Sequence, residues 1–113
     1  MAMATLSNDI KSNIAQQAAA LATTLVTGFV NQAVQDGNAF LQQTENDIAT
    51  WLQDLQQNKI TQKNFESLVR GEKDLAQMHA LKQAGLGQVA IDTFINGFIQ
   101  IVINVALSSI KFA

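Results

Sequence analysis

Two long stretches of this chain, residues 12–35 and 93–110, contain no charged residue. Each is about the length that a helix needs to cross a lipid bilayer, roughly 20 residues. Both stretches are nevertheless interspersed with Gln, Asn, Thr and Ser, whose polar groups are costly to place against lipid without partners. The two stretches must therefore be either core helices of a folded domain or membrane helices that have partners.

The rest of the chain also favours helices. There is no Pro among the 113 residues, whereas Ala, Gln and Leu are abundant. Pro is the strongest helix breaker, and these three residues are among the best helix formers. The length corresponds to one domain. We therefore expect a single all-α domain that spans residues 1–113.

Capping residues and glycines suggest where the first helices begin and end. The first helix is predicted to start after Thr5 or Ser7, which are both good N-cap residues, and to extend to about Gln35. Gly37, flanked by Asp and Asn, is predicted to end it in the left-handed conformation. A second helix is then expected over about 39–57.

The later part of the chain is divided in the same way. Thr61 is predicted to cap a short helix over about 62–70, which Gly71 ends. Another helix is expected over about 72–84, followed by the most apolar segment, about 86–111. The predicted architecture is a bundle of about four helices, in which the long N- and C-terminal helices pack antiparallel with two shorter helices between them.

The last helix carries a polar residue at every fourth position, and almost everything between these positions is apolar. The polar stripe consists of Gln88, Asp92, Asn96, Gln100, Asn104 and Ser108. Positions four apart advance by only about 40° around a helix, so most of the circumference is apolar. A surface helix needs an apolar stripe of about 100° or somewhat more. The helix therefore has more apolar surface than one neighbouring helix can cover. This surplus predicts an interaction surface made of Phe94, Ile95, Phe98, Ile99, Val102, Ile103, Leu107 and Ile110.

Three environments could cover this surplus. The helix could lie at the centre of its own bundle, with the polar stripe emerging at one seam. It could pack against copies of itself, where a ladder of amides would fix the register. It could also enter a membrane with the stripe facing a partner helix or a pore, although no Tyr is present to mark an interface.

Composition argues against several classes of function. Charged residues make up 14% of the chain, the net charge is −2, and there is no Cys and one His, His79. A basic nucleic-acid module and a Cys or His metal site both lack the residues they need. Asp92 is the only carboxylate in the last helix and has no base, nucleophile or metal ligand beside it. We therefore expect neither an enzyme nor a cofactor or metal site.

Three glycine-containing positions stand out in the sequence. Residues 85–90 read Gly-Leu-Gly-Gln-Val-Ala, which fits the dinucleotide fingerprint, but that motif must follow a β-strand and a helix is expected before it. The segment is therefore interpreted as a helix break. Gly28 and Gly97 fall inside apolar helical segments and predict close contacts between helices, because Gly is unfavourable in a helix without a packing reason.

The sequence therefore predicts a non-enzymatic protein that acts through helix-mediated association, as a homo-oligomer or with a helical protein partner in a larger assembly. The alternative is a membrane-active protein that inserts its terminal helices and forms a pore. A ligand-binding bundle is a third class, without a positive sign in the sequence. No basic residue precedes Lys11, so no signal peptide is recognised, and we expect a cytoplasmic protein or one exported without a cleaved signal.

Overall fold

A computed structural model describes residues 6–110 of the chain, except for the side chain of Asp74, and this part is helical without a strand. The predicted all-α fold is confirmed. Five α-helices and one 3-10 helix follow one another. They are α1 (Asn8–Leu25), α2 (Val30–Gln56), α3 (Gln62–Gly71), η1 (Glu72–Leu75), α4 (His79–Gln83) and α5 (Gln88–Ser108). Residue 111, where the last helix was expected to end, lies outside the described residues.

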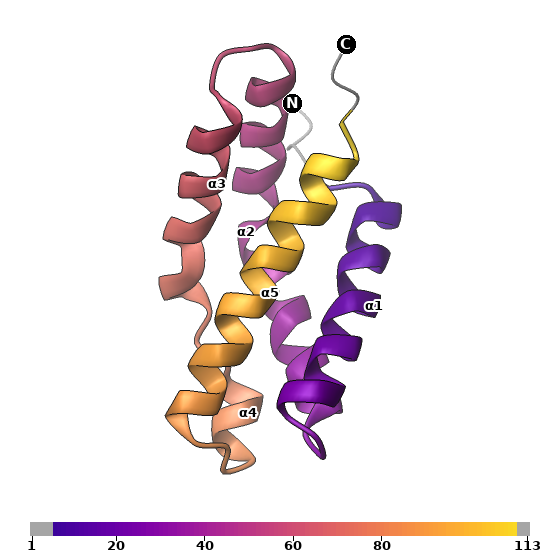
Figure 1. Cartoon of the computed structure of the whole chain (residues 1–113), viewed down its shortest axis with the longest axis vertical. Helices are drawn as coiled ribbons and strands as arrows, with labels where there is room; N and C mark the ends of the chain where they lie inside the picture. Colours follow the sequence, from indigo (N-terminus) through magenta and orange to yellow (C-terminus); the bar gives the residue numbers. More distant parts are fainter. Residues whose placement is uncertain (1–5, 111–113) are drawn as a thin grey trace.

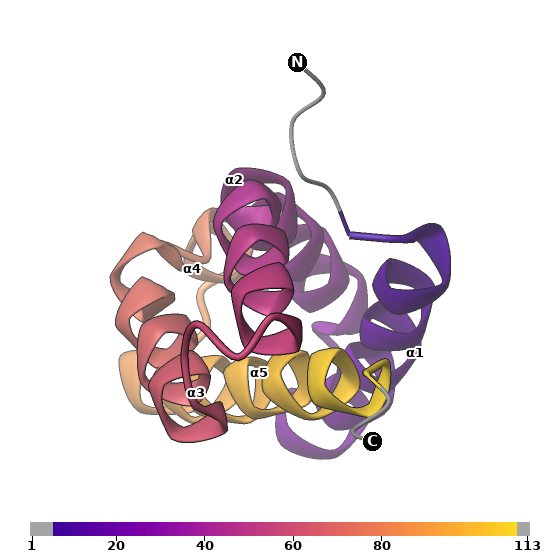
Figure 2. The same ribbon diagram turned by 90° about the horizontal axis from the view of Figure 1, so that it is seen from above.

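The helices pack around α5, which crosses the front of the molecule in Figure 1. Viewed from above, α1 lies on one side of α5, α3 and α4 lie on the other, and α2 lies behind it (Figure 2). The helices α1 and α5 pack against each other and run in opposite directions. Two shorter helices were expected between them, but α2 has 27 residues and is the longest helix of the chain.

The predicted break at Gly37 is wrong, because α2 runs straight through this position. The chain turns nine residues earlier, between α1 and α2, where Gly28 adopts a φ of +90°. This conformation is readily available only to Gly. As a consequence, the first helix is ten residues shorter than expected, and α2 gains the segment that precedes Gly37.

Two helix starts follow the capping rules. The hydroxyl of Ser7 accepts a hydrogen bond of 3.2 Å from the backbone N–H of Ile10, so Ser7 caps α1, while the other candidate, Thr5, lies outside the described residues. At the start of α3, Thr61 and Asn64 form a reciprocal capping box, in which each side chain accepts from the backbone N–H of the other. The predicted cap at Thr61 is confirmed.

The helix predicted over 72–84 is interrupted. After η1 the chain reaches Met78, which has a φ of +52°, and α4 then begins at His79. No side chain near α4 in the sequence caps it. Instead, Asp36 of α2 accepts hydrogen bonds from the backbone N–H groups of Ala80 (2.9 Å, Oδ1) and Leu81 (2.8 Å, Oδ2). A residue more than 40 positions away therefore satisfies the free N–H groups at the start of this short helix.

The hydrophobic core lies where α5 meets the other helices. Its largest fully buried side chains include Phe65, Phe94 and Phe98. The rings of Phe40 and Phe98 meet edge to face at 5.7 Å, and those of Phe94 and Phe98 lie 6.0 Å apart. These aromatic contacts join α2 to α5 at the centre of the molecule.

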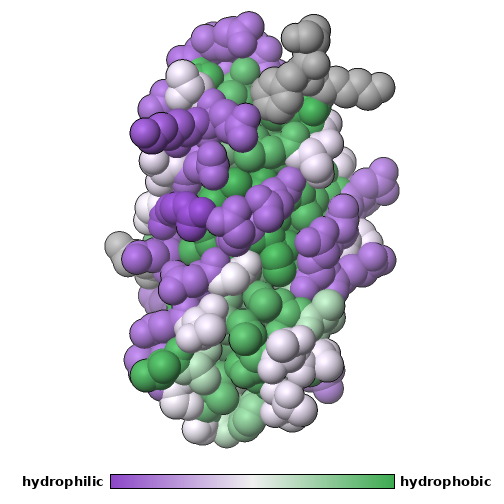
Figure 3. Space-filling view, in the orientation of Figure 1, coloured by the Kyte–Doolittle hydropathy of each residue, from purple (hydrophilic) through white to green (hydrophobic). Residues whose placement is uncertain are grey.

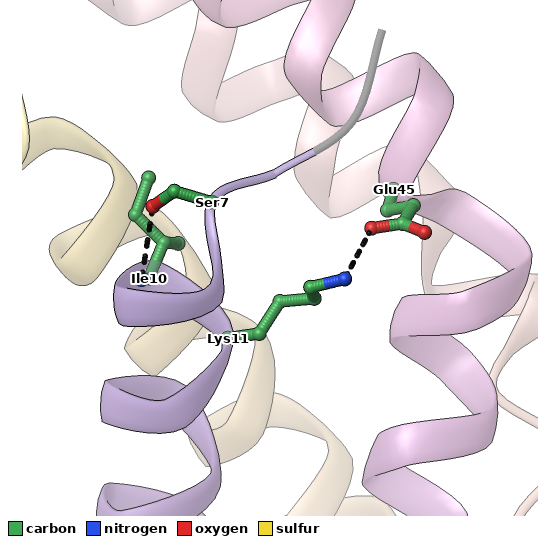
Figure 4. A network of polar contacts seen from close by, with 4 residues as sticks. All are labelled: Ser7, Ile10, Lys11 and Glu45. Carbon is green, nitrogen blue, oxygen red and sulfur yellow. Dashed lines mark hydrogen bonds and ion pairs between the residues drawn. The ribbon is translucent and has the colours of Figure 1, made fainter. Parts of the chain in front are cut away.

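One ion pair joins α1 to α2. The ammonium nitrogen of Lys11 lies 3.2 Å from Oε2 of Glu45, and Figure 4 shows this pair beside the Ser7 cap. The Lys11 side chain remains partly exposed, at 38%. Exposed ion pairs contribute about 0–1 kcal/mol, so this pair orients α1 more than it stabilises the fold.

Candidate interaction surface

The side chains predicted for the interaction surface on α5 are used mainly by the core of the chain itself. Two of them, Ile95 and Leu107, are partly buried. The six that are buried are Phe94, Phe98, Ile99, Val102, Ile103 and Ile110. The helix α5 contacts every other helix, and these contacts cover most of its apolar circumference. A partner of the folded chain can therefore reach only the outward side of α5.

The polar stripe identifies that outward side. Gln88, Asp92, Asn96, Asn104 and Ser108 are exposed, and Gln100 is partly buried. From residue 96 onward, all the residues of α5 that are not buried fall within an arc of about 140°, at about 100° per residue. The slow drift of the stripe keeps it within this arc. Its position corresponds to the first of the three environments considered from the sequence, a central helix whose polar side emerges at one seam.

Much of the hydrogen bonding within the stripe lies along the helix. The amide of Gln88 donates to Oδ1 of Asp92 at 2.8 Å, and the amide of Gln100 donates to Oδ1 of Asn104 at 2.9 Å. Arg70 of α3 donates to the carbonyl oxygen of the Gln100 side chain. These groups therefore already have partners within one chain.

Several apolar residues remain on the outside of the two terminal helices. Val89 of α5 is 82% exposed and Leu25 of α1 is 39% exposed. Leu21, Ile101 and Leu107 are partly buried. We call these five residues the terminal-helix surface. Figure 3 shows apolar side chains on the upper and lower parts of the face that α5 crosses, with hydrophilic side chains between them and at the edges.

The helices α1 and α5 approach each other closely at Gly97. A Cβ atom added there would lie 2.7 Å from Cδ2 of Leu21, so the Leu21 side chain occupies the space that a larger residue would need. The close contact predicted at Gly97 is present. The same prediction for Gly28 is wrong, because an added Cβ atom there would have no neighbour within 4 Å.

Four of the five residues of the terminal-helix surface lie in the two uncharged stretches, and Val89 lies just before the second, three residues from the exposed Asp92. No residue of 12–35 or 93–110 is charged, whereas 12 of the 16 charged residues of the chain lie between Asp36 and Lys82. Asp9 and Lys11 carry charge at the start of α1, whereas from residue 12 onward the polar side chains on its outside are Ser, Asn, Gln and Thr, several of which are hydrogen-bonded within the helix. Such groups lose less free energy than ions do when water is removed from them.

The other candidate residues do not gather into a reactive site. His79 is exposed at the start of α4, and Asp92 is exposed on α5. Within residues 6–110, no three His, Cys, Asp or Glu side chains are grouped so as to hold a metal ion. Gly85 has a φ of +92° in the turn between α4 and α5, and the segment before it is helical, as expected for a helix break.

The position of Asp36 differs from the one that the sequence predicts. Asp36 is expected in a turn, but the residue is 7% exposed and its carboxylate lies against the start of α4. Its spacing from two apolar residues could have indicated this buried position. Asp36 lies four positions before Phe40 and three after Ala33, both of them buried, and therefore on the inner side of a continuous helix.

Within the described part of the chain, α5 is the one helix that is long and apolar enough to cross a membrane by length and composition. In the folded chain, 44% of the relevant window is buried. No family model, no curated protein and no solved structure matches the chain.

Proposed function

We propose that this protein acts by helix-mediated association, as a homo-oligomer or as a subunit of a larger protein assembly, through the terminal-helix surface. The observation that carries the proposal is the exposure of Val89 and Leu25 on helices whose outward sides have almost no charge. Asp92 is the exception on α5. An exposed apolar surface of this kind is typical of a contact surface when it is contiguous.

The energetics support an association through this surface. Burial of apolar area contributes about 25 cal/mol per Å², and large aliphatic side chains such as Leu and Ile supply most of it. The amides and hydroxyls around them can exchange water for hydrogen bonds to a partner. Apart from Asp92, this side of the two helices carries little charge, so two copies can approach each other with little repulsion between like charges.

The contact that we propose is narrower than the one the sequence predicts. It uses Val89, Ile101 and Leu107 on α5, with Leu21 and Leu25 on α1, and leaves the six buried residues of α5 in the core. Exposing those six residues to a partner would require the bundle to open and would forfeit their packing. The folded chain can associate without this cost.

Sedimentation velocity over a wide range of protein concentration tests the proposal. The wild-type protein is expected to form a defined oligomer, and Leu25→Lys is expected to shift it toward the monomer. Leu68→Lys is a matched control, because Leu68 of α3 is 38% exposed, almost the same as Leu25, but lies outside the terminal-helix surface. A wild-type monomer at all concentrations contradicts self-association, and equal effects of the two variants contradict the choice of surface.

If the wild-type protein is a monomer, the assembly form of the proposal predicts a helical partner. The wild-type protein is then expected to capture this partner. Leu25→Lys is expected to lose the partner and Leu68→Lys to retain it. Loss in both variants or in neither would contradict a contact through this surface.

A second candidate function is membrane insertion, which the length and composition of α5 support. Insertion would require α1 to separate from α5, because the two helices cover each other at Gly97. Dye release from liposomes tests this candidate. A crosslink through Leu21→Cys and Gly97→Cys is expected to abolish release, and reduction of the crosslink is expected to restore it. Absence of release by the wild-type protein would contradict the candidate.

A further inference from the structure

A pocket of about 230 Å³ lies between α2 and the segment that joins η1 to α4. Its lining includes Asp36 and Phe40 of α2, Leu75 at the end of η1, Met78 of the joining segment and His79 at the start of α4. Apart from Asp36, no Asp, Glu, Lys or Arg lines it. Pockets for drug-sized ligands usually measure about 300–1,000 Å³, so this pocket suits a smaller molecule.

Asp36 makes this pocket chemically distinct. The residue is 7% exposed, and both oxygens of its carboxylate accept hydrogen bonds from N–H groups at the start of α4. A carboxylate has about four acceptor positions, of which these bonds occupy two. Further acceptor positions therefore remain for a donor in the pocket that Asp36 lines.

The charge of Asp36 has no matching cation within the described residues. No described Lys or Arg lies within 4.0 Å of it, and the ion pair that α2 forms joins Glu45 to Lys11 of α1, on another side of the helix. Buried charges are normally paired or bound to a metal. The partial positive charge at the start of α4 compensates only part of it, because a helix of five residues has a small dipole.

The remaining lining defines the rest of the ligand. Phe40, Leu75, Met78 and alanines supply apolar surface beside Asp36, and Gln43 and Gln77 supply amides. A metal ion is usually held by several charged or imidazole ligands, and the described residues hold no group of three His, Cys, Asp or Glu that could bind one. A small organic cation can be bound by one carboxylate with an apolar surface beside it, and this pocket offers both.

From these observations we infer that the pocket is a binding site for a small primary amine with a short apolar chain. The ammonium group donates to Asp36 and supplies the missing positive charge. The apolar chain lies against Phe40, Leu75 and Met78. The site is independent of the terminal-helix surface, since none of its lining belongs to α1 or α5.

Titration with hexylamine at neutral pH, followed by amide chemical shifts, tests the inference. Hexylamine carries an ammonium group under these conditions, whereas 1-hexanol has the same chain without the charge, and hexanoate has the opposite charge. We expect saturable shifts at residues 76–81 with hexylamine. The two control compounds are expected to bind at least about tenfold more weakly, because a charged hydrogen bond to Asp36 is lost.

Two variants separate the pocket from the fold. Ala39→Leu fills the pocket from an exposed position of its lining and leaves the hydrogen bonds of Asp36 in place, so the affinity for hexylamine is expected to fall at least about tenfold. Ala20→Leu is the matched control on α1, which does not line the pocket, and is expected to bind as the wild type does. Asp36→Asn is expected to lose binding as well, with helicity and Trp51 fluorescence used to check folding.

Several results would overturn the inference. They are equal affinity for hexylamine and 1-hexanol, absence of saturable binding by the wild-type protein, and unchanged binding by Ala39→Leu. If Asp36→Asn does not fold, the comparison of the three compounds and the Ala39→Leu variant still decide the outcome.

Discussion

Gly28 and Gly37 lie on either side of the start of α2, and each has the role that the sequence predicts for the other. Gly28, within an apolar run, forms the turn with a φ of +90° and has no neighbour within 4 Å of an added Cβ atom. Gly37, flanked by turn-forming residues, is helical, and Cε2 of Phe98 would lie 2.9 Å from its added Cβ atom. Gly28 is needed for backbone conformation, whereas Gly37 is needed for space.

The surroundings explain the exchange. Asp36 beside Gly37 favours turns when only neighbouring residues are considered. In the folded chain, however, its carboxylate binds the start of α4, and the missing side chain at Gly37 admits the Phe98 ring. Distant contacts on both residues therefore keep the helix continuous where local preference would end it. Gly28 has no such contacts, and the chain turns there.

The largest effect on the free energy of unfolding is expected from Asp36→Ala. This change removes both acceptors for the N–H groups of Ala80 and Leu81 and leaves these groups without partners at the edge of the core. The free energy of unfolding is expected to fall by about 2–4 kcal/mol. Urea unfolding, followed by Trp51 fluorescence, measures the change, and a loss below about 0.5 kcal/mol would contradict the role of Asp36 as a cap across the structure.

Gly37→Ala is expected to destabilise the protein by about 1–3 kcal/mol, because the added methyl group overlaps the buried Phe98 ring. In an exposed helix the same change would stabilise by up to about 1 kcal/mol. The double variant with Phe98→Leu provides the control. The cost of Gly37→Ala should become smaller in that background, and an unchanged cost would show that Phe98 is not its cause.

Gly28→Ala is expected to cost about 1–2 kcal/mol through its positive φ. Gly28→Asn should cost less, since Asn tolerates positive φ better than Ala does. The comparison is made by thermal or urea unfolding of the two variants. If Ala and Asn were equally tolerated, the backbone explanation for this turn would be wrong.

The smallest effect on stability is expected at the contact between Glu72 of η1 and Asp47, another acidic residue of α2. Burial raises the pKa of Glu72 above its ordinary value of 4.5, and the nearby Asp47 charge and a hydrogen bond to Asp47 raise it further. A raised carboxyl pKa means that the contact favours folding at low pH and that this contribution is lost as the pH rises through the raised pKa. At neutral pH the pair therefore opposes folding, in contrast to Asp36.

Glu72→Gln is accordingly expected to stabilise the protein slightly at neutral pH and to have less effect near pH 4. Urea unfolding of the variant and the wild type at both pH values measures the difference. A difference that does not change with pH would argue against the Asp47–Glu72 contact.

Local chemistry predicts part of this fold well. The absence of Pro and the helical periodicity predict an all-α chain, and Thr61 predicts the start of α3 from the oxygen that its side chain offers. The stripe from Gln88 to Ser108 predicts which side of α5 is polar, because the polar positions of a core helix face water.

The rest depends on contacts between distant residues. The sequence alone shows neither that Phe98 fills the space above Gly37 nor that Asp36 reaches α4. It also overestimates the apolar surface left on α5, since Phe94, Ile99 and Ile103 are covered by helices whose positions only the fold determines. The terminal-helix surface is smaller than predicted for the same reason.

The cap on α4 has a consequence for the order in which the chain folds. A helix of five residues does not form alone, because its nucleation is unfavourable and it is too short to recover that cost. Its first N–H groups depend on Asp36, so α4 can become stable only after α2 has formed and docked beside it. The amide hydrogens of Ala80 and Leu81 therefore exchange with solvent whenever that docking is lost, and their exchange rates report how often α2 and α4 separate.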